Sequence, residues 1–187
     1  MGAFAVPRLT PEEYLALDRA AEFKSEFHDG EMFPISNISW THAQIVGALA
    51  GSLRTRLKQG PCGVGVSPMR VMVSANHYVC PDITVVCEKP QFTDSHVDTL
   101  TNPKVIIEVL SPSTADYDRG GKSVLYRGLS SLEEYVIVAQ DTYLAEVIRR
   151  TGHNQWTTTV YEGQDSILEI PSIAFSIPLS EIFDGIL

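Results

Sequence analysis

The chain has 187 residues, of which 44% are hydrophobic and 20% are charged, and its net charge is −9. This length and composition are typical of one globular domain with enough residues for a real core. The acidic balance argues against a protein that coats nucleic acid through bulk electrostatic attraction, but a local basic groove remains compatible with it.

Neither a membrane span nor a secretory signal is expected. No apolar run reaches transmembrane length, and the first ten residues lack a charged segment followed by a long apolar one. The three cysteines, Cys62, Cys80 and Cys87, are odd in number and have no metal-ligand spacing. We therefore expect a cytoplasmic protein with reduced, mostly buried thiols.

The N-terminal part predicts a helix followed by a hairpin. The sequence TPEE at 10–13 combines a capping threonine, a proline for the first turn and a glutamate for a capping box, so a helix should run to about Ala20. Asp29-Gly30 is a hairpin turn signal between two short strands, roughly 24–28 and 31–35.

The clearest helical period lies between Thr41 and Lys58. Its apolar stripe consists of Ile45, Val46, Leu49, Leu53 and Leu57. A strand over 64–73, with an irregularity at Pro68, and a second strand over 78–87 follow it.

The second half of the chain alternates strands with one helix. A buried strand is expected over 105–110 and a helix over about 119–128, which would present Lys122, Leu125, Tyr126 and Leu129 on one side. Further strands are expected over 135–139, 143–150, 155–162, 167–170 and 174–177, and a last helical turn or two over 179–187. This order predicts an α/β (α+β) protein whose mixed central sheet is flanked by helices.

Two carboxylates interrupt the buried strands. Asp82 opens one apolar run and Glu108 lies inside another. A buried carboxylate is costly without a compensating positive charge, and two of them side by side repel unless a cation lies between them. Mg²⁺ is commonly held by one or two carboxylates together with water and substrate phosphate. We therefore hypothesise that Asp82 and Glu108 bind a metal ion and that Lys122 faces the substrate.

Each of these residues also has a simpler interpretation. Asp82, which follows a proline, would then cap a strand or a turn, and Glu108 would be a buried acid with a structural partner. Lys122 would be a surface residue of its helix, paired with Asp118 four residues earlier.

The chain resembles the Uma-type restriction endonuclease family of the PD-(D/E)XK nuclease superfamily. The stretches that carry the resemblance are EFHDGE at 26–31, THAQIVGAL at 41–49, PDITVV at 81–86, IEVLSPSTADYDRGGKSVLY at 107–126 and SLEEYVIV at 131–138. The resemblance implies a single restriction-endonuclease-like domain over 1–187. Its parts would be an N-terminal helix and hairpin at about 10–36, a nuclease core at about 41–140 and C-terminal strands at about 143–187.

The resemblance also implies a site and an activity. Asp82 and Glu108 match the two metal-binding acids of the superfamily, and the backbone carbonyl of Val109 would be a further metal ligand. The usual lysine lies two residues after the second acid, where this chain has Leu110. Lys122 fits a relocation of that lysine to the following helix. The implied function is hydrolysis of DNA by an Mg²⁺- or Mn²⁺-dependent endonuclease that forms a homodimer.

Other assignments stay open. Glu26 or Glu31 would supply an extra acid near the metal or else be solvated hairpin charges, and His42 would reach the site or a phosphate or else be structural. The tyrosines Tyr117, Tyr126 and Tyr135 are expected to pack rather than to stack on bases. The alternative function is a catalytically silent protein that serves as a DNA-binding or oligomeric interaction module, which Leu110 and the net charge favour. A metal-dependent hydrolase of another substrate is a third reading.

Overall fold

The computed structural model describes residues 8–35, 38–66, 69–111 and 114–187. Its helical segments are α1 (Pro11–Ala20), α2 (Trp40–Leu57), α3 (Ala115–Tyr117), a π-helical turn (Asp118–Lys122), α4 (Ser123–Arg127), a 3-10 turn (Pro171–Ile173) and α5 (Leu179–Ile182). Its strands are β1 (Ser25–His28), β2 (Glu31–Pro34), β3 (Gly63–Val66), β4 (Arg70–Ser74), β5 (His77–Val79), β6 (Ile83–Val86), β7 (Thr99–Leu100), β8 (Val105–Val109), β9 (Glu134–Val138), β10 (Leu144–Gly152), β11 (Gln155–Glu162), β12 (Ile167–Ile170) and β13 (Phe175–Pro178). In these ranges, no helix is long and apolar enough to cross a membrane.

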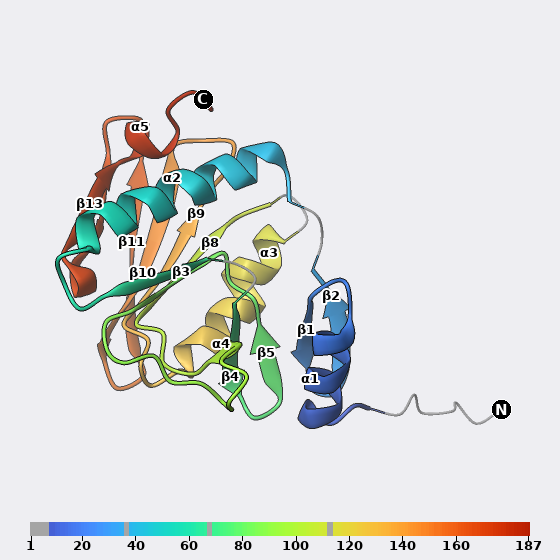
Figure 1. Ribbon diagram of the computed structural model, residues 1–187. Helices are drawn as coiled ribbons and strands as arrows, with labels where there is room; N and C mark the ends of the chain where they lie inside the picture. The colour runs from blue at the N-terminus through green and yellow to red at the C-terminus, as the bar shows by residue number, and fades with distance from the viewer. Residues whose placement is uncertain (1–7, 36–37, 67–68, 112–113) are drawn as a thin grey trace.

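A six-stranded mixed sheet forms the centre of the molecule, in the order β11-β10-β9-β8-β6-β3 (Figure 1). Only the β8–β9 pair is parallel among these neighbours, and the others are antiparallel. The predicted stripe of α2 packs on one face, where Ile45, Leu49 and Leu53 are buried with Ile107 of β8. Helix α4 and residues after it cover the other face, where Tyr126 and Leu132 pack with neighbours such as Ile106. The predicted mixed sheet flanked by helices is confirmed.

A second sheet of five strands lies beside the first, in the order β2-β1-β5-β4-β7. Helix α1 has the predicted capping box, with the Thr10 side chain and Glu13 each accepting a backbone N–H of the other residue. It packs on this sheet through Tyr14, whose ring stacks on Phe27 at a centroid distance of 4.8 Å. Local sequence signals therefore place α1 and the β1–β2 hairpin as predicted.

The chain passes from one sheet to the other and back. Strand β3 belongs to the six-stranded sheet, β4 and β5 belong to the five-stranded sheet, and β6 returns to the first. The two continuous strands predicted over 64–73 and 78–87 are therefore wrong, because each is divided between two sheets. The irregularity expected at Pro68 lies outside the described residues.

A buried ion network fixes α1 and the five-stranded sheet together. Arg70 of β4 is 1% exposed and contacts the fully buried carboxylate of Asp18 as well as Asp98, whose Oδ2 lies 2.6 Å from Nη2. Arg19 of α1 also donates to Asp98, at 2.8 Å. These guanidinium groups hold the pKa of Asp98 far below its usual range, with the hydrogen bond from Arg19 as the largest cause.

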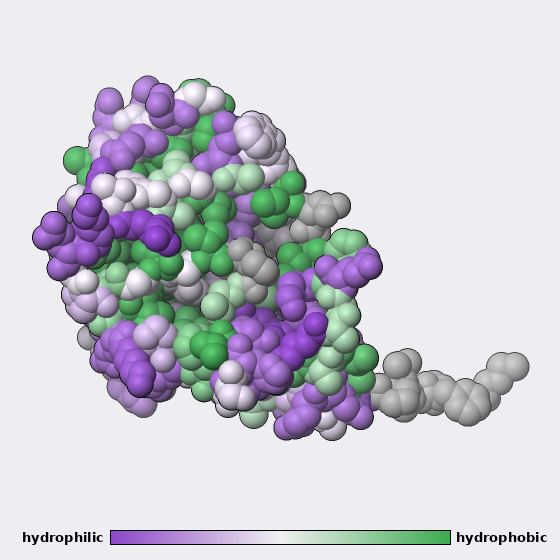
Figure 2. Space-filling model, viewed as in Figure 1, coloured by the Kyte–Doolittle hydropathy of each residue, from purple (hydrophilic) through white to green (hydrophobic). Residues whose placement is uncertain are grey.

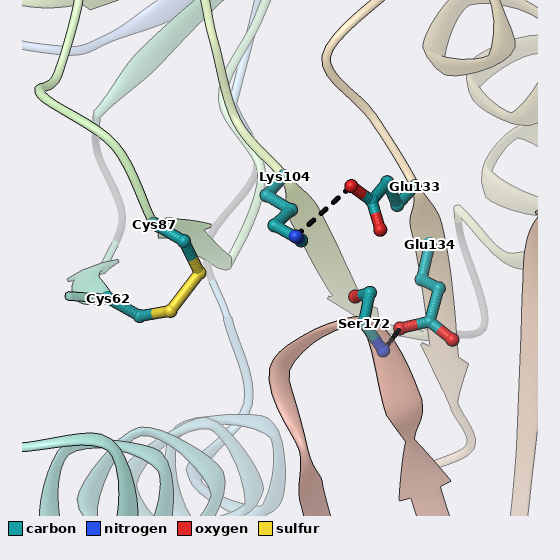
Figure 3. The surroundings of a disulfide bond; sticks show 6 residues. All are labelled: Cys62, Cys87, Lys104, Glu133, Glu134 and Ser172. Atoms are coloured by element: carbon teal, nitrogen blue, oxygen red, sulfur yellow. Dashed lines mark hydrogen bonds and ion pairs between the residues drawn. A yellow bond between two sulfur atoms is a disulfide. The ribbon is translucent and has the colours of Figure 1, made fainter. Parts of the chain in front are cut away.

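Cys62 and Cys87 form a disulfide (Figure 3). They lie next to Gly63 of β3 and Val86 of β6, which are paired with each other across the two antiparallel strands. The prediction of three reduced thiols is wrong for this pair, and Cys80 is the free, buried cysteine. The pairing of Cys62 with Cys87 depends on strand register, which cysteine spacing alone does not reveal.

Candidate active site

Glu108 lies in the middle of the molecule, on the central strand β8. It is 4% exposed, and its Oε1 accepts hydrogen bonds from the Tyr126 hydroxyl at 2.7 Å and the Lys122 amine at 3.0 Å. Its Oε2 accepts a longer bond of 3.3 Å from the Asp82 backbone N–H. Burial raises the pKa of Glu108 to about 8, with the Asp82 and Asp118 carboxylates adding to the shift and Lys122 opposing it.

Asp82 does not lie inside a strand, as predicted, but in the bend between β5 and β6. Its Oδ2 accepts the Val109 backbone N–H at 2.8 Å, so the carboxylate closes onto the end of β8 beside Glu108. Its Oδ1 lies 2.9 Å from His42 Nε2. The turn-capping interpretation is therefore partly right, but the carboxylate also binds the residue that follows the second acid.

Lys122 is buried, with 7% of its surface exposed, and the surface-helix interpretation is wrong. Its amine lies 3.0 Å from Glu108, 3.2 Å from Glu26 and 3.4 Å from Asp118. Burial opposes the charged amine, but the three carboxylates together raise its pKa well above the ordinary value. The expected pair with Asp118 is present, as one contact of three.

The helix that carries Lys122 begins earlier than predicted and is irregular. The helical segment starts at Ala115 instead of about Arg119, and a π-helical turn spans Asp118–Lys122 before α4. Such turns often occur at functional sites, because the extra residue changes the direction of the side chains. Here Asp118 and Lys122 both face the interior.

The two hairpin acids differ in position. Glu26 of β1 accepts the Cys80 backbone N–H at 3.1 Å in addition to its contact with Lys122, whereas Glu31 of β2 is exposed and does not line the cleft. Burial would raise the pKa of Glu26, but hydrogen bonds from His28 and Cys80 and the charge of Lys122 bring it below its usual value.

His42 lies at the site because of the first turn of α2. The Ser39 side chain caps this helix by accepting the His42 backbone N–H at 3.0 Å. Besides the Nε2 contact with Asp82, the ring has a buried Nδ1 that finds no hydrogen-bond partner among the described residues. The sequence left open whether His42 reaches the site, and the structure brings it there.

Tyr126 is the residue that sequence reasoning missed as a partner of Glu108. The expected packing role is also present, since Tyr126 and Tyr135 are buried with ring centroids 4.9 Å apart. Tyr126 follows Lys122 by four residues, and this helical spacing is the one signal that could have linked it to the lysine. Tyr117 is 37% exposed and lies on the cleft, so it is not part of the packed core.

These residues surround a cleft of about 950 Å³. Its lining combines acids and the buried lysine with apolar and aromatic side chains. The lining residues are Glu26, His28, Phe33, Pro34, Ile35, Ile38, His42, Cys80, Asp82, Glu108, Val109, Ser111, Thr114, Tyr117, Asp118, Gly120, Gly121, Lys122, Val124 and Leu125. Leu110 is not among them; it is 5% exposed and packs in the core with residues of α4.

Two acids and a buried lysine are thus linked by hydrogen bonds beside the mixed central sheet. The family model described as "Putative restriction endonuclease" (Uma2) matches residues 11–180, and this chain belongs to that family. The expected membership is confirmed.

Two proteins from Synechocystis sp. are similar to this chain over most of its length. The uncharacterized protein slr1290 is 33% identical over 96% of this chain and 94% of its own length. The uncharacterized protein sll1609 is 35% identical over 86% of this chain and 92% of its own.

A crystal structure of a "putative nuclease belonging to DUF820" from Anabaena variabilis has the same fold. Its TM-score with this chain is 0.79 at 19% identity, and the match covers 96% of this chain and 99% of that one.

Proposed function

We propose that this chain is a metal-dependent endonuclease that hydrolyses phosphodiester bonds in DNA. Asp82 and Glu108 bind the metal ion and Lys122 is the catalytic lysine. The observation that supports this proposal is that these three residues line one cleft, with Asp82 and Lys122 both hydrogen-bonded to the Glu108 carboxylate, although they come from a bend, a strand and a helix. Leu110 has no amine at the sequence position where the resemblance implies a lysine, and Lys122 is proposed to supply one from the following helical segment.

The side chains fit a hard divalent cation, Mg²⁺ or Mn²⁺. Two carboxylates lie on the same cleft wall, and the Val109 carbonyl is proposed as a third oxygen ligand. Among the residues that the structure describes, no three His, Cys, Asp or Glu side chains are grouped to hold an ion. Water and substrate phosphate would therefore complete the coordination, which is the usual mode for Mg²⁺.

A divalent ion held by Asp82 and Glu108 would supply polarisation of the scissile phosphate and would lower the pKa of water toward neutral pH. In hydrolysis, the water oxygen forms a bond to phosphorus while the bond from phosphorus to one sugar oxygen breaks, and in net terms one proton of the water passes to the leaving sugar oxygen. Negative charge develops on the phosphate oxygens in the transition state. The positively charged Lys122 amine stabilises this negative charge. Tyr126 fixes the orientation of Glu108, and the Val109 N–H and His42 fix that of Asp82.

The second candidate is a silent interaction module. The observation that favours it is the full engagement of the Lys122 amine by three carboxylates, which also suits a purely structural role. In that case the cleft would bind no metal.

The deciding experiment compares wild type, Asp82→Asn and the control Asp165→Asn, which changes an exposed aspartate away from the cleft. Supercoiled and linear DNA are incubated with Mg²⁺ or Mn²⁺, and Mn²⁺ binding is measured by calorimetry. We expect wild type and the control to bind Mn²⁺ and to cleave, and Asp82→Asn to lose at least about 100-fold in cleavage rate. Wild-type protein that neither binds Mn²⁺ nor cleaves would favour the silent module.

We further propose that the chain forms a homodimer through β11. This strand is an edge of the six-stranded sheet, and its sequence QWTTTVYE contains no lysine or proline. Thr157, Thr158, Thr159 and Val160 are all exposed. Edge strands are usually protected by charge, proline or cover, so an unprotected one supports pairing with a second copy.

A further inference from the structure

We propose that one wall of the cleft binds an unpaired nucleobase, so that the substrate is a single strand or a locally unpaired strand instead of an intact duplex. This inference rests on the proposed nuclease function and specifies its substrate. The aromatic wall consists of His28, Phe33 and Tyr117, which line the same cleft as the two acids.

Two rings of the aromatic wall have a large exposed fraction, unlike side chains in a packed core. Phe33 of β2 is 46% exposed and Tyr117 is 37% exposed. The His28 ring lies between them, with centroid distances of 5.5 Å to Phe33 and 5.8 Å to Tyr117. Exposed apolar side chains line the same cleft, and among them Ile38 and Val124 are 59% and 71% exposed. In Figure 2, hydrophobic (green) surface is exposed on the face in view, beside hydrophilic surface.

The volume of the cleft suits a nucleotide rather than a duplex. Pockets for small organic ligands have volumes of roughly 300–1,000 Å³, and this cleft has about 950 Å³. A paired base inside a duplex keeps its faces stacked on neighbouring bases. It must leave the stack before an aromatic side chain can cover it.

Charge leads to the same conclusion. Among the described residues that line the cleft, Lys122 is the one lysine or arginine, and three carboxylates already contact its amine. Phosphate contacts, which dominate the binding of duplex DNA, are therefore scarce at this site. Apart from the proposed metal ion, stacking of bases on aromatic rings is the main source of affinity that the lining residues offer, and it requires no specific sequence.

Tyr117 is held in place from two sides. Its hydroxyl lies 3.0 Å from His28 Nε2, and this nitrogen lies 3.4 Å from a Glu26 oxygen. On the other side, a Cβ at Gly121 would come within 2.7 Å of the Tyr117 ring, so glycine is needed for the observed ring position. The neighbouring Gly120 has no such contact, since nothing lies within 4 Å of its would-be Cβ.

The test measures binding without cleavage, by fluorescence anisotropy in EDTA. The probes are a labelled single DNA strand of about 12 nucleotides, the same strand in duplex, and a strand of equal length without bases. We expect the single strand to bind at least about tenfold more tightly than either of the others. Phe33→Ala and Tyr117→Ala should each weaken its binding by about 5- to 100-fold. The matched control Phe23→Ala, an exposed phenylalanine outside the cleft, should leave binding unchanged.

A second pair of variants checks the position of the ring. Gly121→Ala should weaken single-strand binding because the added methyl group displaces Tyr117, and Gly120→Ala should not. Equal binding by this pair would overturn the assigned role of Tyr117.

The inference fails if the duplex binds as tightly as the single strand, if no strand binds, or if Phe33→Ala binds like wild type. It fails separately from the proposed function. Cleavage of duplex DNA that depends on Asp82 but is unchanged in Phe33→Ala would keep the nuclease and refute the base site. If the protein never cleaves but binds a single strand in a way that depends on Phe33, the base site would be supported and the nuclease function would be refuted.

Discussion

Lys122 shows how a single buried charge organises the candidate site. Its amine balances carboxylates from β1, β8 and the π-helical turn, all within 3.4 Å. Removing one partner of a buried ion pair is costly because the remaining charges lose their compensation. The same side chain therefore contributes to folding as well as to the proposed chemistry.

We predict that Lys122→Met lowers the free energy of unfolding by about 3 kcal/mol. Urea denaturation at pH 7 measures this difference, and Lys89→Met, at an exposed lysine, is the control. A Lys122→Met protein as stable as the control would show that the three acids need no buried cation.

At this scale the sequence predicted the identities of Asp82, Glu108 and Lys122 but only some of their contacts. Glu108 in an apolar strand is a local signal, since a buried acid requires a partner. Tyr126 contacts Glu108, and Glu26 contacts Lys122. Both contacts depend on how the helix and the two sheets pack, and the pattern of residues along the chain does not specify this packing. The roles proposed for the three residues stay predictions.

Elements with local chemical signals were predicted well. The capping box of α1, the Asp29-Gly30 turn and the stripe of α2 each depend on neighbouring residues, and each lies where expected. The strand over 78–87 was wrong because its apolar run continues across the point where the chain changes sheets. Hydrophobicity marks both halves as buried but does not record which sheet each half joins.

The edge strand β11 allows a prediction about assembly. Thr157→Lys combined with Thr159→Lys places like charges on a strand that would pair with its own copy, so we expect the dimer to dissociate. Light scattering after gel filtration should give twice the 20.6 kDa of one chain for wild type and 20.6 kDa for the variant. Thr55→Lys, at an exposed position of α2, should remain a dimer, and a monomeric wild type would refute the proposal.

At the scale of the whole molecule, the bonding and burial of the three cysteines depend on how the two sheets are packed. The disulfide joins β3 and β6 of the six-stranded sheet, and Cys80 is buried at the end of the five-stranded one. Burial is the largest cause that raises the pKa of the Cys80 thiol to about 12, and the nearby Glu26 carboxylate adds to it. Since the thiolate is the reactive form, Cys80 should be inert in the folded protein.

We therefore predict three results in a thiol assay at pH 8. The native protein should show no reactive thiol, the unfolded protein without reductant should show one, and the unfolded, reduced protein should show three. Cys80→Ser serves as the control and should show none until it is reduced. Three thiols in unfolded protein purified without reductant would contradict the disulfide.

The passage of the chain between the two sheets has a consequence for how the cleft responds to a ligand. Glu26 and Cys80 come from the five-stranded side, whereas Asp82 and Glu108 belong to the six-stranded side. Any molecule that bridges these side chains ties two separately hydrogen-bonded sheets to each other. By mass action, such a ligand stabilises the docked arrangement by an amount that grows with the logarithm of its concentration above the dissociation constant. Substitutions under α1, far from the acids, would then weaken ligand binding without touching the ligand.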